Sequence, residues 1–222
     1  MIRRIQLAPI VLVFGLVSGG AHATLQGRDL NGSADSFEAY YDTDLDITWL
    51  ADANYANTSG YNAGGTMTWA TANTWAASLS FTDGVNTYDN WRLPTTLQPD
   101  ASCAGQSGYN CAGSEMGHLF YSELGGTAGQ SILTSADPDL AKFSNLQAYY
   151  YYWSATEWAP YTGNGWYFRF YDGLQASADK STNGFYAFAV RPGDVAAVPE
   201  AQTYALMLAG LGLIGWRARR RG

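Results

Sequence analysis

The chain carries a short apolar segment with nearby arginines at each end, and these two segments limit which residues are left to fold. Arg3 and Arg4 precede an apolar stretch over residues 7–17, and Ala21 and Ala23 form a small-x-small pair after it. This order is typical of a secretory signal peptide that is cleaved after Ala23. We therefore predict a signal peptide over residues 1–23 and export by the general secretion machinery.

The C-terminal segment has its parts in the opposite order. The sequence Val198-Pro199-Glu200-Ala201 opens it, and an apolar run continues to Trp216. The sixteen residues 201–216 would span roughly 24 Å as a helix, less than the ~30 Å hydrocarbon core of a bilayer. The basic residues after the run favour the cytoplasmic side of a membrane; they are Arg217, Arg219, Arg220 and Arg221. We predict a transient membrane anchor over residues 198–222.

This C-terminal arrangement resembles the PEP-CTERM sorting signal. The resemblance implies that an exosortase, a membrane-embedded cysteine transpeptidase, recognises Pro199 and Glu200. It also implies release to the cell surface or to an exopolysaccharide matrix. Ala201 stands where the motif usually has a second proline. An ordinary short tail anchor is the alternative interpretation.

Charge limits the partners of the part between these segments. The full chain has a formal net charge of −7, but six of its twelve basic residues are the terminal arginines. Without these arginines and Glu200, six basic and eighteen acidic residues remain, a net charge of −12. A domain this acidic repels phosphate backbones and anionic lipids. We therefore exclude nucleic acid as a partner and expect membrane contact through the C-terminal segment alone.

Residues 24–197 are predicted to form one α+β domain with two helices and a mainly antiparallel sheet, because helical patterns come early and strands late. The helices are expected at Thr68–Leu79, with Thr68 as N-cap, and at Glu115–Leu124, between an N-cap at Ser114 and a stop at Gly125. The expected strands are Glu38–Asp42, Leu45–Leu50, Trp91–Leu93, Trp166–Tyr171, Leu174–Ala178 and Phe185–Arg191, the last central in its sheet. Residues 24–36 are expected to be irregular, and Asp172-Gly173 to form a two-residue hairpin turn.

Several motifs in this middle part follow one another in a recognisable order. They include Trp91-Arg92-Leu93-Pro94-Thr95, Tyr152-Trp153-Ser154 and Val190-Arg191-Pro192. The order resembles the Lcl C-terminal domain family, a group of uncharacterised exported domains, over roughly residues 37–192. The resemblance implies an irregular fold similar to C-type lectins and formylglycine-generating enzymes. We expect the tryptophans of these motifs to fill the core and their arginines to tie loops together.

Cys103 and Cys111 are the only cysteines of the chain. An even number of cysteines in an exported protein favours a disulfide, which we predict between these two. Two thiolates at this spacing lack the further ligands that zinc needs, so a metal site is the poorer interpretation. The pairing would also remove a nucleophilic cysteine of the formylglycine-generating type.

Catalytic residues are not evident. After signal-peptide cleavage His118 is the only histidine, and it is expected to be a surface or half-buried residue of the second helix without a nucleophile beside it. Asp42, Asp44 and Asp46 lack the glycine and distal glutamate of a calcium loop, so we expect them on one solvated strand face. We predict no catalytic residue, no metal site and no cofactor, with bound calcium as the alternative. A polysaccharide-acting enzyme that uses paired carboxylates is the alternative.

Aromatic residues crowd the segment 149–171, which also contains Pro160, Gly163 and Gly165. Exposed rings stack on the apolar faces of sugars, so we predict Trp158 and Tyr161 as glycan contacts, with core packing as the alternative. Gln98 and Asp100 are weaker candidates: a Gln-Pro-Asp tripeptide coordinates calcium and sugar hydroxyls in C-type lectins, but no Trp-Asn-Asp companion follows it here, and chance occurrence in a proline turn is the favoured interpretation. The chain is thus expected to be a non-enzymatic surface or matrix protein that binds extracellular polysaccharide. A purely structural matrix component is the third interpretation.

Overall fold

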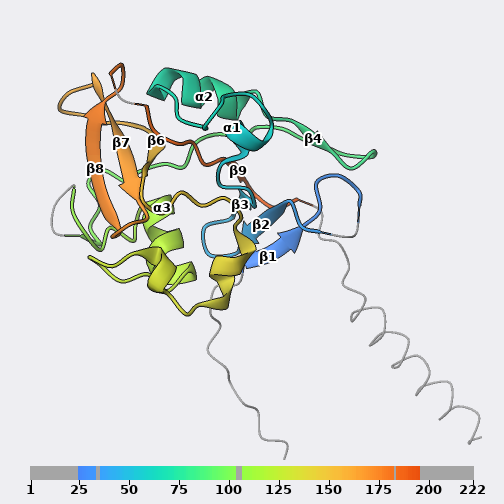
Figure 1. The fold of residues 1–222 in the computed structure, drawn as a ribbon, viewed down its shortest axis with the longest axis horizontal. Helices are drawn as coiled ribbons and strands as arrows, with labels where there is room; N and C mark the ends of the chain where they lie inside the picture. Colours follow the sequence, from blue (N-terminus) through green and yellow to red (C-terminus); the bar gives the residue numbers. More distant parts are fainter. Residues whose placement is uncertain (1–24, 34–35, 104–106, 183, 196–222) are drawn as a thin grey trace, which may run out of the picture.

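The computed structural model describes residues 25–33, 36–103, 107–182 and 184–195. These residues form a few short helices and several antiparallel sheets, which confirms the predicted α+β class. Figure 1 shows the sheet β6–β8 at one end of the molecule and β1–β3 toward the other, with α2 above and α3 below. The predicted signal peptide and C-terminal anchor lie outside the described residues. Within the described ranges, no helix has the length and hydrophobicity of a membrane span.

The elements are short. The strands are β1 (Leu25–Arg28), β2 (Ala39–Asp42), β3 (Ile47–Leu50), β4 (Phe81–Thr82), β5 (Thr87–Tyr88), β6 (Tyr151–Glu157), β7 (Asn164–Arg169), β8 (Leu174–Asp179) and β9 (Val190–Pro192). The helices are α1 (Tyr55–Thr58), α2 (Trp69–Ala77), α3 (Glu115–His118), the π-helical η1 (Leu119–Glu123), and the 3₁₀ turns η2 (Ile132–Thr134) and η3 (Pro138–Lys142).

The four-stranded sheet has the order β1-β2-β3-β9, and every neighbouring pair is antiparallel. Strands β2 and β3 lie where the sequence predicts them. The expectation of an irregular segment over 24–36 is wrong at its start, because Leu25–Arg28 pairs with β2. This pairing depends on tertiary context: Gly27 lies so close to the Phe37 ring that a Cβ atom would overlap it. Local residue preferences do not contain that contact.

The sheet β6-β7-β8 contains the predicted hairpin, but its loop is longer than expected. Arg169 pairs with Leu174, which leaves the four residues 170–173 in the loop instead of two. Asp172 accepts hydrogen bonds from Arg169 Nε at 2.7 Å and from Leu174 N at 3.1 Å. Gly173 has a φ of +79°. The carboxylate of Asp172 therefore holds the wider turn in shape.

The segment 185–191 was predicted as a central strand, and this prediction is wrong. Its last residues contribute to β9, which lies at an edge of the four-stranded sheet. Phe185 and Tyr186 instead form single bridges to Met67 and to Tyr152 of β6. The apolar run 187–189 is buried, with Phe188 in one apolar cluster of the core and Ala187 and Ala189 in the other. The predicted strand Trp91–Leu93 is likewise only one bridge, from Arg92 to Val190.

Both predicted helices are present, with one difference in capping. Thr68 caps α2 through its side chain, as expected. Ser114 occupies the N-cap position of α3, but its hydroxyl donates to Asp100 at 3.0 Å and makes no cap hydrogen bond. The second helix then widens into η1, in which Leu124 N donates to Leu119 O at 2.9 Å. Gly125, at a φ of +62°, ends it as predicted.

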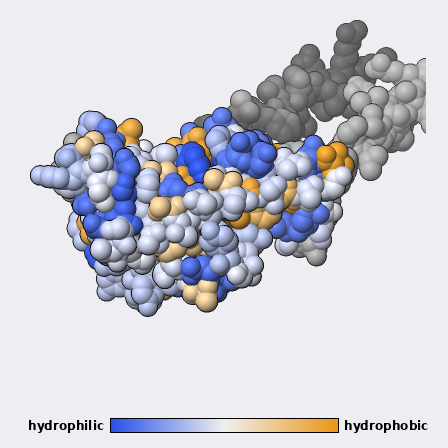
Figure 2. Space-filling model, turned by 90° about the horizontal axis from the view of Figure 1, so that it is seen from above, coloured by the Kyte–Doolittle hydropathy of each residue, from blue (hydrophilic) through white to orange (hydrophobic). Residues whose placement is uncertain are grey.

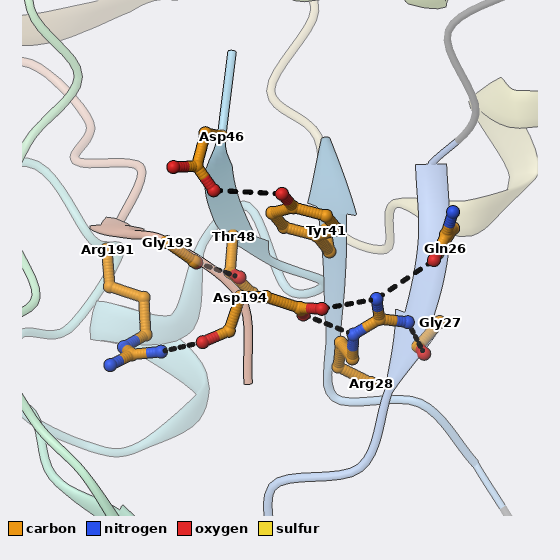
Figure 3. A network of polar contacts seen from close by, with 9 residues as sticks. All are labelled: Gln26, Gly27, Arg28, Tyr41, Asp46, Thr48, Arg191, Gly193 and Asp194. Atoms are coloured by element: carbon orange, nitrogen blue, oxygen red, sulfur yellow. Dashed lines mark hydrogen bonds and ion pairs between the residues drawn. The ribbon is translucent and has the colours of Figure 1, made fainter. Parts of the chain in front are cut away.

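Two apolar clusters form the core, one around α3 and η1 and one under α2. Trp91 and Trp153 are buried, and Arg92 makes a bidentate ion pair with Glu115, with both N–O distances 2.7 Å. Arg191 donates to the carbonyl of Asp194 at 3.0 Å, within the network of Figure 3. These contacts confirm the structural roles predicted for the motif tryptophans and arginines.

The same network joins the first described strand to the last described residues (Figure 3). Arg28 of β1 contacts both carboxylate oxygens of Asp194, at 2.5 and 2.9 Å. Thr48 donates to the carbonyl of Gly193 at 2.8 Å. The chain after β9 therefore crosses the sheet and contacts β1, the strand at the opposite edge.

Candidate functional site

The loop between β6 and β7, residues 158–163, presents the two aromatic residues that the sequence marks as glycan contacts. Its backbone is closed on itself: Trp158 N donates to Asn164 O at 2.9 Å, and Asn164 N donates to Tyr161 O at 2.9 Å. Tyr161 N also donates to Trp158 O at 3.0 Å. These bonds hold the loop in one compact turn, so the two rings have a defined relative position.

The two rings form an exposed pair beside a hollow. Tyr161 is 66 % exposed and Trp158 is half-buried. Their ring centroids lie 5.0 Å apart with an interplanar angle of 44°. Trp158 also lines a hollow of about 240 Å³, together with Trp166 and three small residues, Ser107, Ala176 and Ser177. The arrangement offers aromatic faces next to hydroxyl groups, which suits a ligand with both apolar and polar faces.

Gln98, which is half-buried, supports this loop through its side-chain amide. Its amide nitrogen donates to the Glu157 carbonyl at 2.7 Å, and its Oε1 accepts from Trp166 Nε1 at 3.0 Å and from Ala159 N at 3.2 Å. Both ends of the amide are therefore used to hold the base of the loop. We assign Gln98 to the positioning of the aromatic pair.

Asp100 lies inside the fold. It is 1 % exposed, its Oδ1 accepts from Ser102, and its Oδ2 accepts from Ser114. The structure thus brings Gln98 next to the aromatic pair but does not present the Asp100 carboxylate at the surface.

The other aromatic residues of 149–171 divide between core and surface. Tyr152 and Trp166 are buried, which agrees with the packing interpretation for these two. Tyr149 and Tyr171 are 65 % and 46 % exposed, with ring centroids 5.6 Å apart. They lie just before β6 and in the β7–β8 loop, so this second exposed pair is at the opposite end of the sheet from Trp158 and Tyr161.

The three aspartates Asp42, Asp44 and Asp46 do not share one strand face, and that expectation is wrong. Asp42 ends β2 and is completely buried, where its Oδ1 accepts from the backbone N–H groups of Asp44 and Leu45. Asp46 is exposed in the turn at a φ of +51° and accepts from the Tyr41 hydroxyl. The Asx turn made by Asp42 therefore separates the carboxylates.

His118 faces two carboxylates, a cluster that the sequence did not indicate. Its Nε2 lies 3.1 Å from Glu123 Oε1 and 3.9 Å from Asp42 Oδ2. The hydrogen bond to Glu123 outweighs burial and raises the pKa of His118, while burial raises the pKa of Asp42. Residues five apart do not share a face of an ordinary α-helix, so only the π-helical turn of η1 reveals this pairing.

The predicted disulfide between Cys103 and Cys111 is present, with a Cα–Cα distance of 4.6 Å. Both cysteine sulfur atoms are part of this bond, so neither is a thiolate that could bind zinc. At the end of the disulfide loop, Cys111 packs on α3 at Gly117, where a Cβ atom would overlap the carbonyl oxygen of Cys111.

The comparison with protein families bears on the C-terminal segment. Residues 197–221 match the family model described as the PEP-CTERM protein-sorting motif. The motif defines an exported protein that an exosortase processes and that is sorted to the cell surface. No curated protein and no solved structure matches the chain. In the view of Figure 2, hydrophobic groups are scattered among hydrophilic ones on the surface of the molecule.

Proposed function

We propose that this exported protein binds extracellular polysaccharide through Trp158 and Tyr161, without catalysis, at the cell surface or in the exopolysaccharide matrix. The observation that carries the proposal is the exposed ring pair, held 5.0 Å apart in a self-bonded loop beside a hollow with two serines. A ring exposed to 66 % in such a fixed loop buries apolar area only when a ligand covers it. Sugars supply that apolar area together with hydroxyls for the serines.

The charge of the domain narrows the class of polysaccharide. The part between the terminal segments has a net charge of −12, so a polymer rich in uronate or sulfate would be repelled. A neutral hexose polymer avoids this repulsion and presents more C–H surface to the rings. We therefore assign neutral glycans as the ligand class.

The resemblance to the Lcl C-terminal domain family belongs to the same proposal. Its motif residues Trp91, Arg92, Trp153 and Arg191 serve packing and loop fastening here, as described above. They support a shared scaffold, similar to C-type lectins, on which the binding loops vary. Ligand binding then depends on the β6–β7 loop and not on the family motifs.

The experiment measures retention of the exported protein on insoluble neutral glucan and on an acidic polysaccharide. The double variant Trp158→Ala/Tyr161→Ala should bind the neutral polymer at least about tenfold more weakly, because removal of an aromatic anchor costs roughly 1.4 kcal/mol or more. Tyr149→Ala/Tyr171→Ala is the matched control, since it removes the other exposed pair from the same sheet. It should bind like the unchanged protein.

Each other outcome contradicts a part of the proposal. Equal retention of both double variants would show that Trp158 and Tyr161 do not bind the polymer. Release of reducing ends from the polymer would make the protein a polysaccharide-acting enzyme. Failure of the unchanged protein to bind any member of a glycan array would leave the role of a structural matrix component.

A further inference from the structure

The cluster of Asp42, His118 and Glu123 lies between the end of β2 and the helical segment α3–η1. Its side chains are 0 %, 14 % and 1 % exposed, respectively. Two carboxylates and one imidazole in a nearly closed space leave a net negative charge when the acids are ionised. Burial of such a charge is costly unless a cation balances it.

One atom of this cluster has nothing to bind. Glu123 Oε2 is buried and has no hydrogen-bond partner among the described residues, although Oε1 of the same carboxylate contacts His118. A buried carboxylate oxygen without a donor is rare, because each such oxygen keeps its full desolvation cost. The unpartnered oxygen belongs to the group that faces the imidazole, so a cation bound at this place would give it a partner.

The spacing of the donor atoms fits a small divalent cation. One donor atom from each of the three residues lies within 4.8 Å of the other two. The separations from His118 Nε2 are 3.1 Å to Glu123 Oε1 and 3.9 Å to Asp42 Oδ2. Ligands of a tetrahedral zinc ion, at about 2.0–2.2 Å from the metal, are about 3.4 Å from one another. The two separations lie on either side of this value, so short side-chain movements would complete the site.

The surroundings hold the donors in place. Asp42 Oδ1 accepts two backbone N–H groups, and Oδ2 accepts from Trp49 Nε1 at 3.4 Å. Such outer hydrogen bonds orient a ligating carboxylate. The π-helical turn η1 brings Glu123 to the imidazole, and turns of this kind occur often at functional sites.

We propose that Asp42, His118 and Glu123 bind one zinc ion, with water as the fourth ligand at the partly exposed edge of His118. Calcium prefers six to eight oxygen ligands and fits this set of three donors poorly. On binding, the cation takes the place of the proton on His118 Nε2 and this proton leaves to solvent. The ion joins the end of β2 to the helical segment and so serves the stability of the fold.

The test uses the exported chain, purified without a histidine tag, freed of metal with a chelator and then titrated with Zn²⁺. The substitution His22→Ala makes His118 the only imidazole in every processed form of the chain. We expect one equivalent of zinc, a rise of several degrees in the unfolding midpoint, and a shift of the single imidazole ¹⁵N signal at Nε2.

Three variants complete the test. Glu123→Gln and His118→Gln should bind zinc at least about tenfold more weakly. Glu157→Gln changes an exposed carboxylate that pairs with Lys180 and should bind like the unchanged chain. Should the cluster variants fail to fold, the imidazole signal of the unchanged fold still decides the question. The absence of a zinc-dependent shift at Nε2, or equal zinc binding by Glu123→Gln, would overturn the proposal.

Discussion

Single residues with several hydrogen bonds hold the turns of this protein, and Asp172 shows how. Its carboxylate accepts from Arg169, from the backbone of Leu174 and from the Tyr109 hydroxyl, so three segments meet at one side chain. Burial alone would raise the pKa of Asp172, but these donors outweigh it and lower that pKa below the ordinary value of 3.8. The ionised form is thus the one that stabilises the fold.

This direction predicts a pH dependence of stability. Because the folded pKa of Asp172 is depressed, its contribution is complete above the ordinary value of 3.8 and is lost as the pH falls through the folded value. Asp172→Asn should lower the free energy of unfolding by about 1 kcal/mol at pH 7, and the difference should shrink below about pH 4. Chemical denaturation at several pH values measures it. A difference that persists unchanged at pH 2 would show that the charge is not responsible.

The sequence predicted residue roles well where one property decides them. Large aromatic rings in strands, such as Trp153, reach the core because of their size, and Gly125 ends its helix because of its positive φ. Prediction from the sequence failed where the partner of a side chain is not set by local residue preferences. Ser114 is a residue type that caps helices, but its hydroxyl donates to Asp100 instead. The buried pairing of Glu123 with His118 was missed for another reason, since it depends on the π-helical turn η1.

At the scale of elements, the predicted helices and most strands are present, since periodicity and capping are local properties. The differences arise from pairing. The segment 185–191 has the residue preferences of a central strand, yet it bridges two sheets, because both of its ends are taken by different partners. Likewise the β7–β8 loop has four residues where Asp-Gly predicts two, since Phe170 turns into the core.

The loop closed by Cys103 and Cys111 makes a prediction at this scale. Closure of so short a loop contributes about 2.5 kcal/mol through the entropy of the unfolded chain. The variant Cys103→Ala/Cys111→Ala should therefore lose stability by roughly that amount in denaturant unfolding. Reduction of the unchanged protein should give a similar loss, and an unchanged midpoint after reduction would show that the bond does not stabilise the fold.

At the scale of the whole molecule, the sorting motif determines what the mature protein contains. Mass spectrometry of surface material should find no residue after Glu200, since the motif is the recognition site of the exosortase. Pro199→Ala should leave the full tail in the membrane fraction, while Gln202→Ala should not. Ala201→Pro restores the usual second proline and should increase the processed fraction. Intact tails on the surface form of the unchanged protein would contradict this prediction.

The ion pair between Arg28 and Asp194 has a consequence for this maturation. It fastens the last described residues to the opening strand, and only residues 196 and 197 separate Val195 from the motif at Val198. Cleavage at the motif therefore falls a few residues after this ion pair. The cleaved product keeps the ion pair between Arg28 and Asp194, whereas removal of a few more residues would take away Asp194 and leave Arg28 of β1 without it.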